Sequence, residues 1–98
     1  MTNAQTILSQ LGGNKFRVMT GARDFVGSDN ALHFALPARM ARNKANKVRV
    51  TLTPADLYTV EFFAARGVSL KSISTHGDVY ADQLAALFEA ETGLATRL

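Results

Sequence analysis

The sequence contains no cysteine, which excludes disulfide bonds, thiolate catalysis and cysteine-ligated zinc. Its apolar runs are all shorter than the stretch of about 18 residues that a membrane-spanning helix requires. The N-terminus also lacks the charged and then apolar pattern of a secretory signal. From these absences we expect a cytoplasmic protein that does not associate with a membrane.

Signatures of catalysis, nucleotide binding and metal binding are missing as well. The glycine-flanked segment GARDFVG, residues 21–27, is neither a Walker A sequence nor a dinucleotide-binding fingerprint. The only histidines, His33 and His76, have no further ligand at metal-binding spacing. The serines near His76 lack the surroundings of a catalytic nucleophile. We therefore expect a non-enzymatic protein with no cofactor and no metal. An enzyme is the alternative, because active sites can also be built from residues that carry no local signature.

The residues that are present predict one folded domain. With 98 residues, of which 47% are hydrophobic and 19% charged, the chain can bury one core but not two. Alternating apolar and polar residues predict five strands, at about 15–20, 31–36, 47–53, 57–64 and 68–74. Helical patterns flank them at 2–11 and 78–92. We expect an α+β two-layer domain whose antiparallel sheet of four to five strands is covered by the C-terminal helix, with the N-terminal helix at its side.

Two three-residue loops, at 54–56 and 65–67, set the predicted register of the last three strands. The first loop places Val48 opposite Phe62, and the second places Phe62 opposite Leu70, so that one face is apolar. The opposite face then carries a charged row made of Arg49, Glu61 and Lys71. We also expect the strand at 31–36 to pair with the strand that begins at Lys47, and residues 75–77 to form a turn before Asp78, the expected helix N-cap. Residues 21–30 should form a loop whose Phe25 and Val26 fold back onto the core.

Positive charge is concentrated in the first half of the chain. Residues 1–54 carry eight basic and two acidic side chains, whereas residues 55–98 carry three basic and six acidic ones. Five cations follow one another without an intervening acidic residue: Arg39, Arg42, Lys44, Lys47 and Arg49. With support from Lys15 and Arg17, this basic stretch is a candidate site for non-specific binding of nucleic acid. Contact with an acidic protein surface and a merely solvated loop are the alternatives.

Several phrases of the sequence resemble a known group of proteins. These phrases are LGGNKF, MTGARDFVGSDNALHFALP, RVTLTPADLYTVEF, VYADQLAALFEAETGL and the terminal ATRL. Together they resemble a family of small uncharacterised proteins of tailed bacteriophages and prophages, over residues 11–98. The resemblance implies a location in the bacterial host cell and one of two functions. The first is a nucleic-acid-binding accessory protein, and the second is a small protein that binds and inhibits a host protein such as a defence complex.

The second of these functions would require an exposed protein interface. In the predicted register, Phe63 and Ile73 fall on the outward face of the sheet beside Lys71, so these three residues are the interface candidates. The same apolar pair could instead join two copies of the chain in a homodimer.

Overall fold

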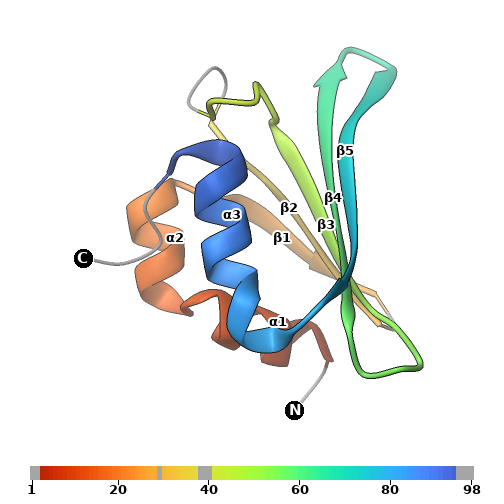
Figure 1. The fold of residues 1–98 in the computed structure, drawn as a ribbon. Helices are drawn as coiled ribbons and strands as arrows, with labels where there is room; N and C mark the ends of the chain where they lie inside the picture. The colour runs from red at the N-terminus through yellow and green to blue at the C-terminus, as the bar shows by residue number, and fades with distance from the viewer. Residues whose placement is uncertain (1–2, 29, 38–40, 95–98) are drawn as a thin grey trace.

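The computed structural model describes residues 3–28, 30–37 and 41–94, and it has a five-stranded antiparallel sheet with helices on one side (Figure 1). The helices are α1 (Asn3–Leu11), α2 (Asn14–Thr20) and α3 (Leu84–Thr92), the last preceded by a 3₁₀ turn at Ala81–Gln83. The strands are β1 (Arg23–Gly27), β2 (Ala31–Ala35), β3 (Lys47–Leu52), β4 (Tyr58–Arg66) and β5 (Ser69–Val79). The strands lie in the order of the sequence, from β1 at one edge to β5 at the other. The predicted α+β fold is confirmed.

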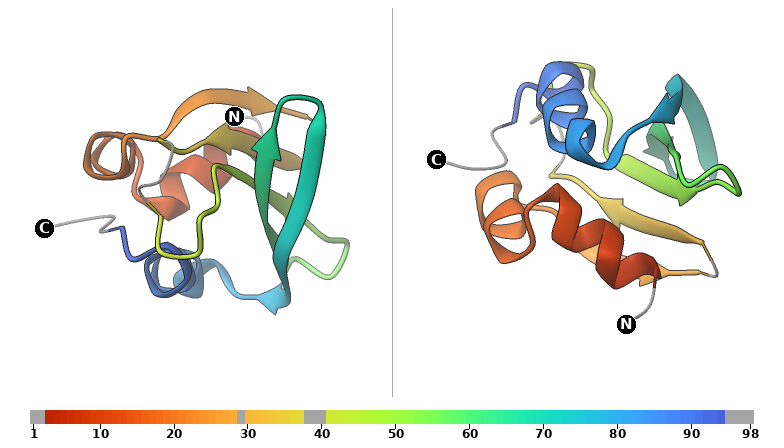
Figure 2. Two further views of the ribbon diagram at one scale, coloured as in Figure 1. Left: turned by 90° about the horizontal axis from the view of Figure 1, so that it is seen from above. Right: turned by 60° about the horizontal axis from the view of Figure 1, so that its bottom comes forward.

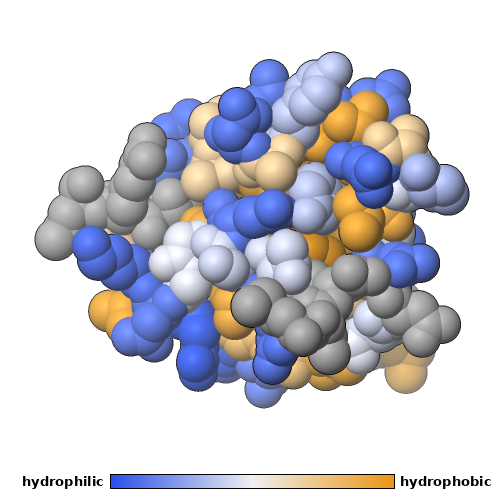
Figure 3. All heavy atoms as spheres, turned by 90° about the horizontal axis from the view of Figure 1, so that it is seen from below, coloured by the Kyte–Doolittle hydropathy of each residue, from blue (hydrophilic) through white to orange (hydrophobic). Residues whose placement is uncertain are grey.

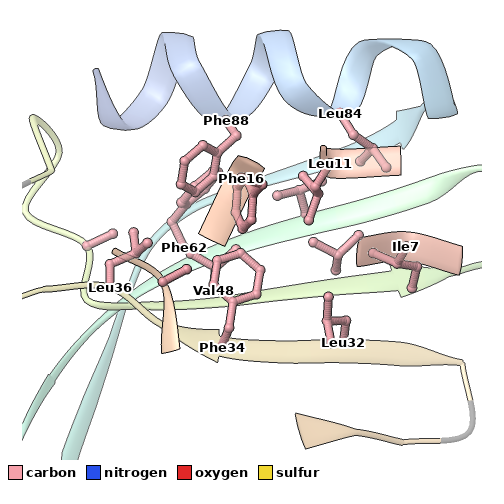
Figure 4. Packing of buried hydrophobic residues seen from close by; sticks show 14 of the residues in the cluster. Ile7, Leu11, Phe16, Leu32, Phe34, Leu36, Val48, Phe62, Leu84 and Phe88 are labelled. Carbon is pink, nitrogen blue, oxygen red and sulfur yellow. The ribbon is translucent and has the colours of Figure 1, made fainter. Parts of the chain in front are cut away.

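All three helices gather on one side of the sheet (Figure 2), and we call the opposite side the open face. A cluster of phenylalanine side chains from four different elements lies between the helices and the sheet (Figure 4). Phe88 of α3 lies 5.0 Å from Phe16 of α2, 6.2 Å from Phe34 of β2 and 6.4 Å from Phe62 of β4, measured between ring centres. All four side chains are at most 2% exposed. Aromatic rings of this size supply a large share of the apolar area that a small domain buries.

The β3–β4 hairpin has the predicted register. Val48 pairs with Phe62, and Val50 pairs with Val60. In the loop, Asp56 adopts a left-handed conformation with φ of 62°, which aspartate tolerates better than most residues. The predicted pairing of β2 with β3 is also confirmed.

The β4–β5 hairpin differs from the prediction. Arg66 pairs with Ser69, so that the turn has two residues instead of three, and Phe62 faces Ser74 instead of Leu70. The register shifts by one residue between Phe62 and Phe63, because an additional residue of β5 forms a bulge there. The alternation of apolar and polar residues cannot reveal such a bulge, because the additional residue reverses the faces on which the following side chains lie.

β5 also continues beyond the predicted end of the strand. The expected turn at 75–77 is part of β5, which reaches Val79. The final helical segment begins at Ala81, not at the predicted residue 78. Asp78 has a φ of 54° and lies beside a second register shift of β5, so it is not the helix N-cap.

The predicted strand at 15–20 is wrong, because these residues form α2. Phe16 and Thr20 are the buried residues of this helix, and a spacing of four is a helical period. Val18, which a strand would bury beside Phe16, is 72% exposed. The helix ends at Gly21 in the left-handed conformation.

Residues 21–30, which we expected to form a loop, contain the edge strand β1. Phe25 is partly buried against the core as predicted, and its ring stacks on that of Phe34 with 5.3 Å between the ring centres. Val26, expected to fold inward with Phe25, is instead 59% exposed. Within the described chain, none of the helices combines the length and the hydropathy that crossing a bilayer requires.

Candidate functional site

The predicted basic residues do not form one surface. Lys15 and Arg17 belong to α2 and therefore to the helical layer. The Arg17 guanidinium lies over the ring of Phe25, 5.5 Å from its centre, and Phe25 in turn stacks on Phe34 in the core. These two cations are thus on the side of the sheet that the helices cover.

Arg42 and Lys44 lie in the connection between β2 and β3, and Arg39 lies outside the described residues. The backbone N–H of Arg42 donates to the carbonyl of Thr92 at 2.6 Å, and its side chain runs alongside Gly93. Arg42 is therefore at the C-terminal end of α3, where the helix dipole favours a cation. This contact gives Arg42 a structural role that does not depend on a ligand.

Lys47 and Arg49 lie on the open face of β3. They alternate with Val48 and Val50, which are at most 2% exposed and face the helices. The register places Lys47 beside Phe63 of β4. Of the described members of the predicted basic set, Lys47 and Arg49 are the two strand residues that lie on the open face.

The position of the Arg49 side chain is fixed by two neighbours. Its Nε and Nη2 atoms lie 2.7 Å and 2.6 Å from Oε1 of Glu61, which is the cross-strand partner of Arg49. Its guanidinium lies over the ring of Phe63, 5.4 Å from the ring centre. A charge-assisted pair and a cation–π contact together hold the guanidinium in one plane.

A groove with a volume of about 480 Å³ lies on the open face. All five strands contribute to its lining, which includes Val26, His33, Lys47, Arg49, Phe63 and Leu70. Val26 and Leu70 are 59% and 60% exposed and form apolar margins on the two edge strands. One acidic residue, Asp24, also lines the groove and forms an exposed ion pair with Arg23 at 3.7 Å. The groove therefore combines cations, aromatic rings and apolar side chains.

His33 is a groove residue that we did not predict. It lies on β2 directly opposite Arg49 of β3, and Val26 of β1 is its partner on the other side. The sequence did indicate that His33 faces outward, because it alternates with Leu32 and Phe34, which are buried. Only the register between β2 and β3 was needed to place it beside Arg49.

The three predicted interface residues do not lie together. Phe63 is on the open face, as expected, and half-buried beneath Arg49. Ile73 is at the bulge of β5 and partly buried against the core. Lys71 pairs with Ala64 instead of Glu61, so the predicted charged row ends at the pair of Arg49 and Glu61.

A second polar cluster joins β5 to α3. Oε1 of Glu91 accepts a hydrogen bond of 3.1 Å from Oγ of Ser74, and the same oxygen atom pairs with Nε2 of His76. Ser74 thus donates to the carboxylate and not to the imidazole, which differs from the nucleophile–base contact of a hydrolase. An open pocket of about 440 Å³ adjoins His76, between β5 and the final helical segment. The cluster links the edge strand to the helical layer.

Metal binding finds no support among the residues that the structure describes, where no three histidine, aspartate or glutamate side chains come together to hold an ion. On the end of the molecule seen in Figure 3, hydrophobic side chains are interspersed with hydrophilic ones. The groove on the open face brings cations together with exposed apolar side chains, and we take it as the candidate binding site.

Comparison with models of protein families, with curated proteins and with solved structures finds no match for this chain. A function is therefore best inferred from the chemistry of the groove.

Proposed function

We propose that this chain is a small, non-enzymatic accessory protein of phage type that binds nucleic acid without sequence specificity, through the groove on the open face. The observation that supports this function is the convergence of Lys47 and Arg49 with Phe63 in that groove. Cations contact phosphates, and planar side chains contact bases, so the groove offers both kinds of contact that nucleic acids use.

The number of cations limits the strength of this binding. Arg49 is already paired with Glu61, so the described lining of the groove supplies one free cation, Lys47. One phosphate contact corresponds to a slope of log affinity against log salt of about −0.7 for single strands and about −0.9 for duplex DNA. Among the described residues, no ion-pair partner of Lys47 lies within 4.0 Å, so its charge is available to a ligand. We expect weak binding that depends on salt.

A fluorescence-anisotropy titration tests the proposal. Labelled single-stranded DNA, duplex DNA and RNA are titrated at about 50 and 200 mM salt, a range over which counterion release changes the affinity. The Lys47→Gln variant should bind more weakly and lose about 0.7 to 0.9 of the salt slope, because one phosphate contact is removed.

Lys15→Gln is the matched control, since it removes the same charge from α2 on the helical side. It should leave the affinity nearly unchanged. Equal losses in both variants would mean that the net charge, not the groove, determines binding. No saturable binding of any nucleic acid at the lower salt concentration would reject the proposal.

A second candidate function is the binding and inhibition of an acidic host protein. The observation in its favour is the projecting tip of the β4–β5 hairpin (Figure 1), residues 66–71. Val68 is fully exposed there and Leu70 is 60% exposed, while Arg66 and Lys71 are exposed cations beside them. Apolar side chains surrounded by positive charge suit a partner with an acidic surface.

A pull-down from bacterial lysate distinguishes this candidate. A stoichiometric partner should be retained by the wild type and lost by Val68→Asp. The control is Val18→Asp, which places the same charge on α2 at a residue that is 72% exposed. Failure of the wild type to recover any stoichiometric partner would count against a protein-binding function.

A further inference from the structure

Two planar side chains lie next to each other in the groove. His33 and Arg49 are cross-strand partners on β2 and β3, and both line the groove. Residues that are directly opposite each other in an antiparallel pair have Cα atoms about 4.5 to 5.5 Å apart. An imidazole and a guanidinium are therefore presented to the same ligand, one beside the other.

The Arg49 guanidinium is held as a flat platform. One of its faces lies over Phe63, and its Nε and Nη2 atoms are bound by Glu61. The side chain is nevertheless 41% exposed. A planar cation that is fixed in this way loses little conformational freedom when an aromatic ligand stacks on it.

Lys47 completes the set on the same face of β3. It is two residues from Arg49, which corresponds to about 6.6 Å along a strand. A charge at this distance from a stacking platform can contact the phosphate of a nucleotide whose base lies on the platform. The groove thus provides a base contact and a phosphate contact within one nucleotide's reach.

Unpaired bases are the groups that fit this arrangement. In a duplex, the faces of the bases are covered by their neighbours, and only the edges reach a protein. In a single strand, the bases can turn outward and stack on aromatic rings, histidine or arginine planes. Because the groove offers planar side chains, it favours bases presented by their faces.

We infer that the groove binds single-stranded nucleic acid, with one base stacked on the Arg49 guanidinium, a neighbouring base against His33, and a phosphate contacted by Lys47. This inference rests on the proposed function and specifies its ligand. The groove extends from Val26 on β1 to Leu70 on β5, which is about 19 Å at a strand spacing of about 4.8 Å. That length accommodates more than one nucleotide, as the two stacked bases require.

The experiment uses a single-stranded DNA probe of about ten nucleotides that contains 2-aminopurine, and the same probe annealed to its complement. Arg49→Lys keeps the charge but removes the plane. We expect its affinity for the single strand to fall at least about fivefold, with a salt slope unchanged from the wild type. The quenching of 2-aminopurine that stacking produces should decrease in the same variant. Lys47→Gln should show the opposite pattern, with quenching retained at saturation and a lower salt slope.

Arg17→Lys is the matched control, because Arg17 also lies over a phenylalanine ring, that of Phe25, but on the helical side. It should bind the single strand like the wild type. Circular dichroism and the unfolding midpoint of Arg49→Lys identify any loss of binding that is due to unfolding. If Arg49→Lys is folded and binds the single strand as tightly as the wild type, the inference is wrong.

Two further outcomes separate this inference from the proposed function. Binding of the duplex as tight as that of the single strand, with the expected effect of Lys47→Gln, would overturn the inference and leave the proposed function standing. Absence of binding to either form, and to single-stranded RNA, would overturn both.

Discussion

Tyr58 connects the sheet to the helical layer through its hydroxyl group. It is 4% exposed, and its Oη atom donates a hydrogen bond of 2.5 Å to Oε1 of Gln10 on α1. Burial raises the pKa of Tyr58 above the usual value of 10.0, and the nearby negative charge of Asp56 acts in the same direction. The neutral phenol is therefore the form that the folded protein stabilises.

This shift predicts a loss of stability at alkaline pH. Above about pH 10, Tyr58 ionises in the unfolded chain while it stays protonated in the folded protein, so the free energy of unfolding falls as pH rises towards the raised pKa. Tyr58→Phe should make this decline shallower. At neutral pH the same variant should be less stable by about 1 kcal/mol, because the hydrogen bond to Gln10 is lost. Urea unfolding from about pH 8 to 11 measures both effects, and an unchanged slope in the variant would contradict the prediction.

Asn46 is a residue whose role could not be predicted. Its side-chain amide donates to the carbonyl of Ala65 at 2.9 Å and accepts from the N–H of Ala65 at 2.7 Å. The Asn46 side chain thereby replaces the backbone partner that Ala65 lacks, because β4 extends past the first residue of β3. The two residues are 19 positions apart in the sequence, and only the strand register brings them together.

Among the helices, α2 and α3 each end at a glycine. Gly21 and Gly93 are both left-handed C-caps with a φ of 72°. A Cβ atom at Gly21 would lie 2.8 Å from Cγ of Pro37, whereas at Gly93 it would meet the flexible side chain of Arg42 at 3.3 Å. The two positions therefore share the same backbone strain but differ in the space for a side chain.

Replacement of these glycines by alanine separates strain from steric clash. Gly93→Ala should lower the free energy of unfolding by about 1 kcal/mol, because the left-handed conformation disfavours a side chain. Gly21→Ala should lower it by at least about 1 kcal/mol more, since the proline ring cannot rotate away. Chemical denaturation of both variants measures the difference. Equal values would show that the chain relaxes around the new methyl group.

Whether a helix or strand could be predicted from the sequence depended on its length and on the regularity of its pattern. The β3–β4 hairpin was predictable because two strands alternate over several residues on either side of a turn that contains Pro54 and Asp56. α2 was not, because in seven residues an apolar residue at every second position resembles a strand. The bulges of β5 leave no periodic signal, so the far end of the sheet had the wrong register.

In the whole molecule, the two sides of the sheet differ in how deeply their aromatic side chains are buried. On one side, Phe88 is 1% exposed and contacts the rings of three other elements. On the other, Phe63 is half-buried and lies under the exposed Arg49. The first side stabilises the fold, and the second is available for binding.

This division predicts opposite consequences for two similar substitutions. Phe88→Ala should lower the free energy of unfolding by about 3 to 5 kcal/mol, because it leaves a cavity in the core. Phe63→Ala should cost no more than about 1 to 2 kcal/mol, since the site is open to water, but it should weaken binding of single strands. Thermal unfolding and anisotropy titration of both variants give the two values. A Phe63→Ala variant as unstable as Phe88→Ala would show that the open face is part of the core.

Sequence proximity was a poor guide to the candidate site. Arg49 was predicted on the correct side of the sheet, because alternation along one strand fixes the side on which each residue lies. Arg42 precedes Lys47 by five residues, but its backbone and side chain lie at the end of α3. Charges that follow one another in a connection separate when the chain turns, whereas residues on adjacent strands, such as His33 and Arg49, come together.

The bulges in the sheet have a consequence for the behaviour of the protein in concentrated solution. Both edge strands, β1 and β5, carry register irregularities, whereas β2 and β3 pair without interruption. A strand from another molecule that approached β5 could follow Ser69 to Ser72 in register before the bulge broke the ladder. Unbroken edges are the templates on which fibrous aggregates grow. The irregular edges of this sheet therefore protect a protein with an open, partly apolar face from polymerising edge to edge.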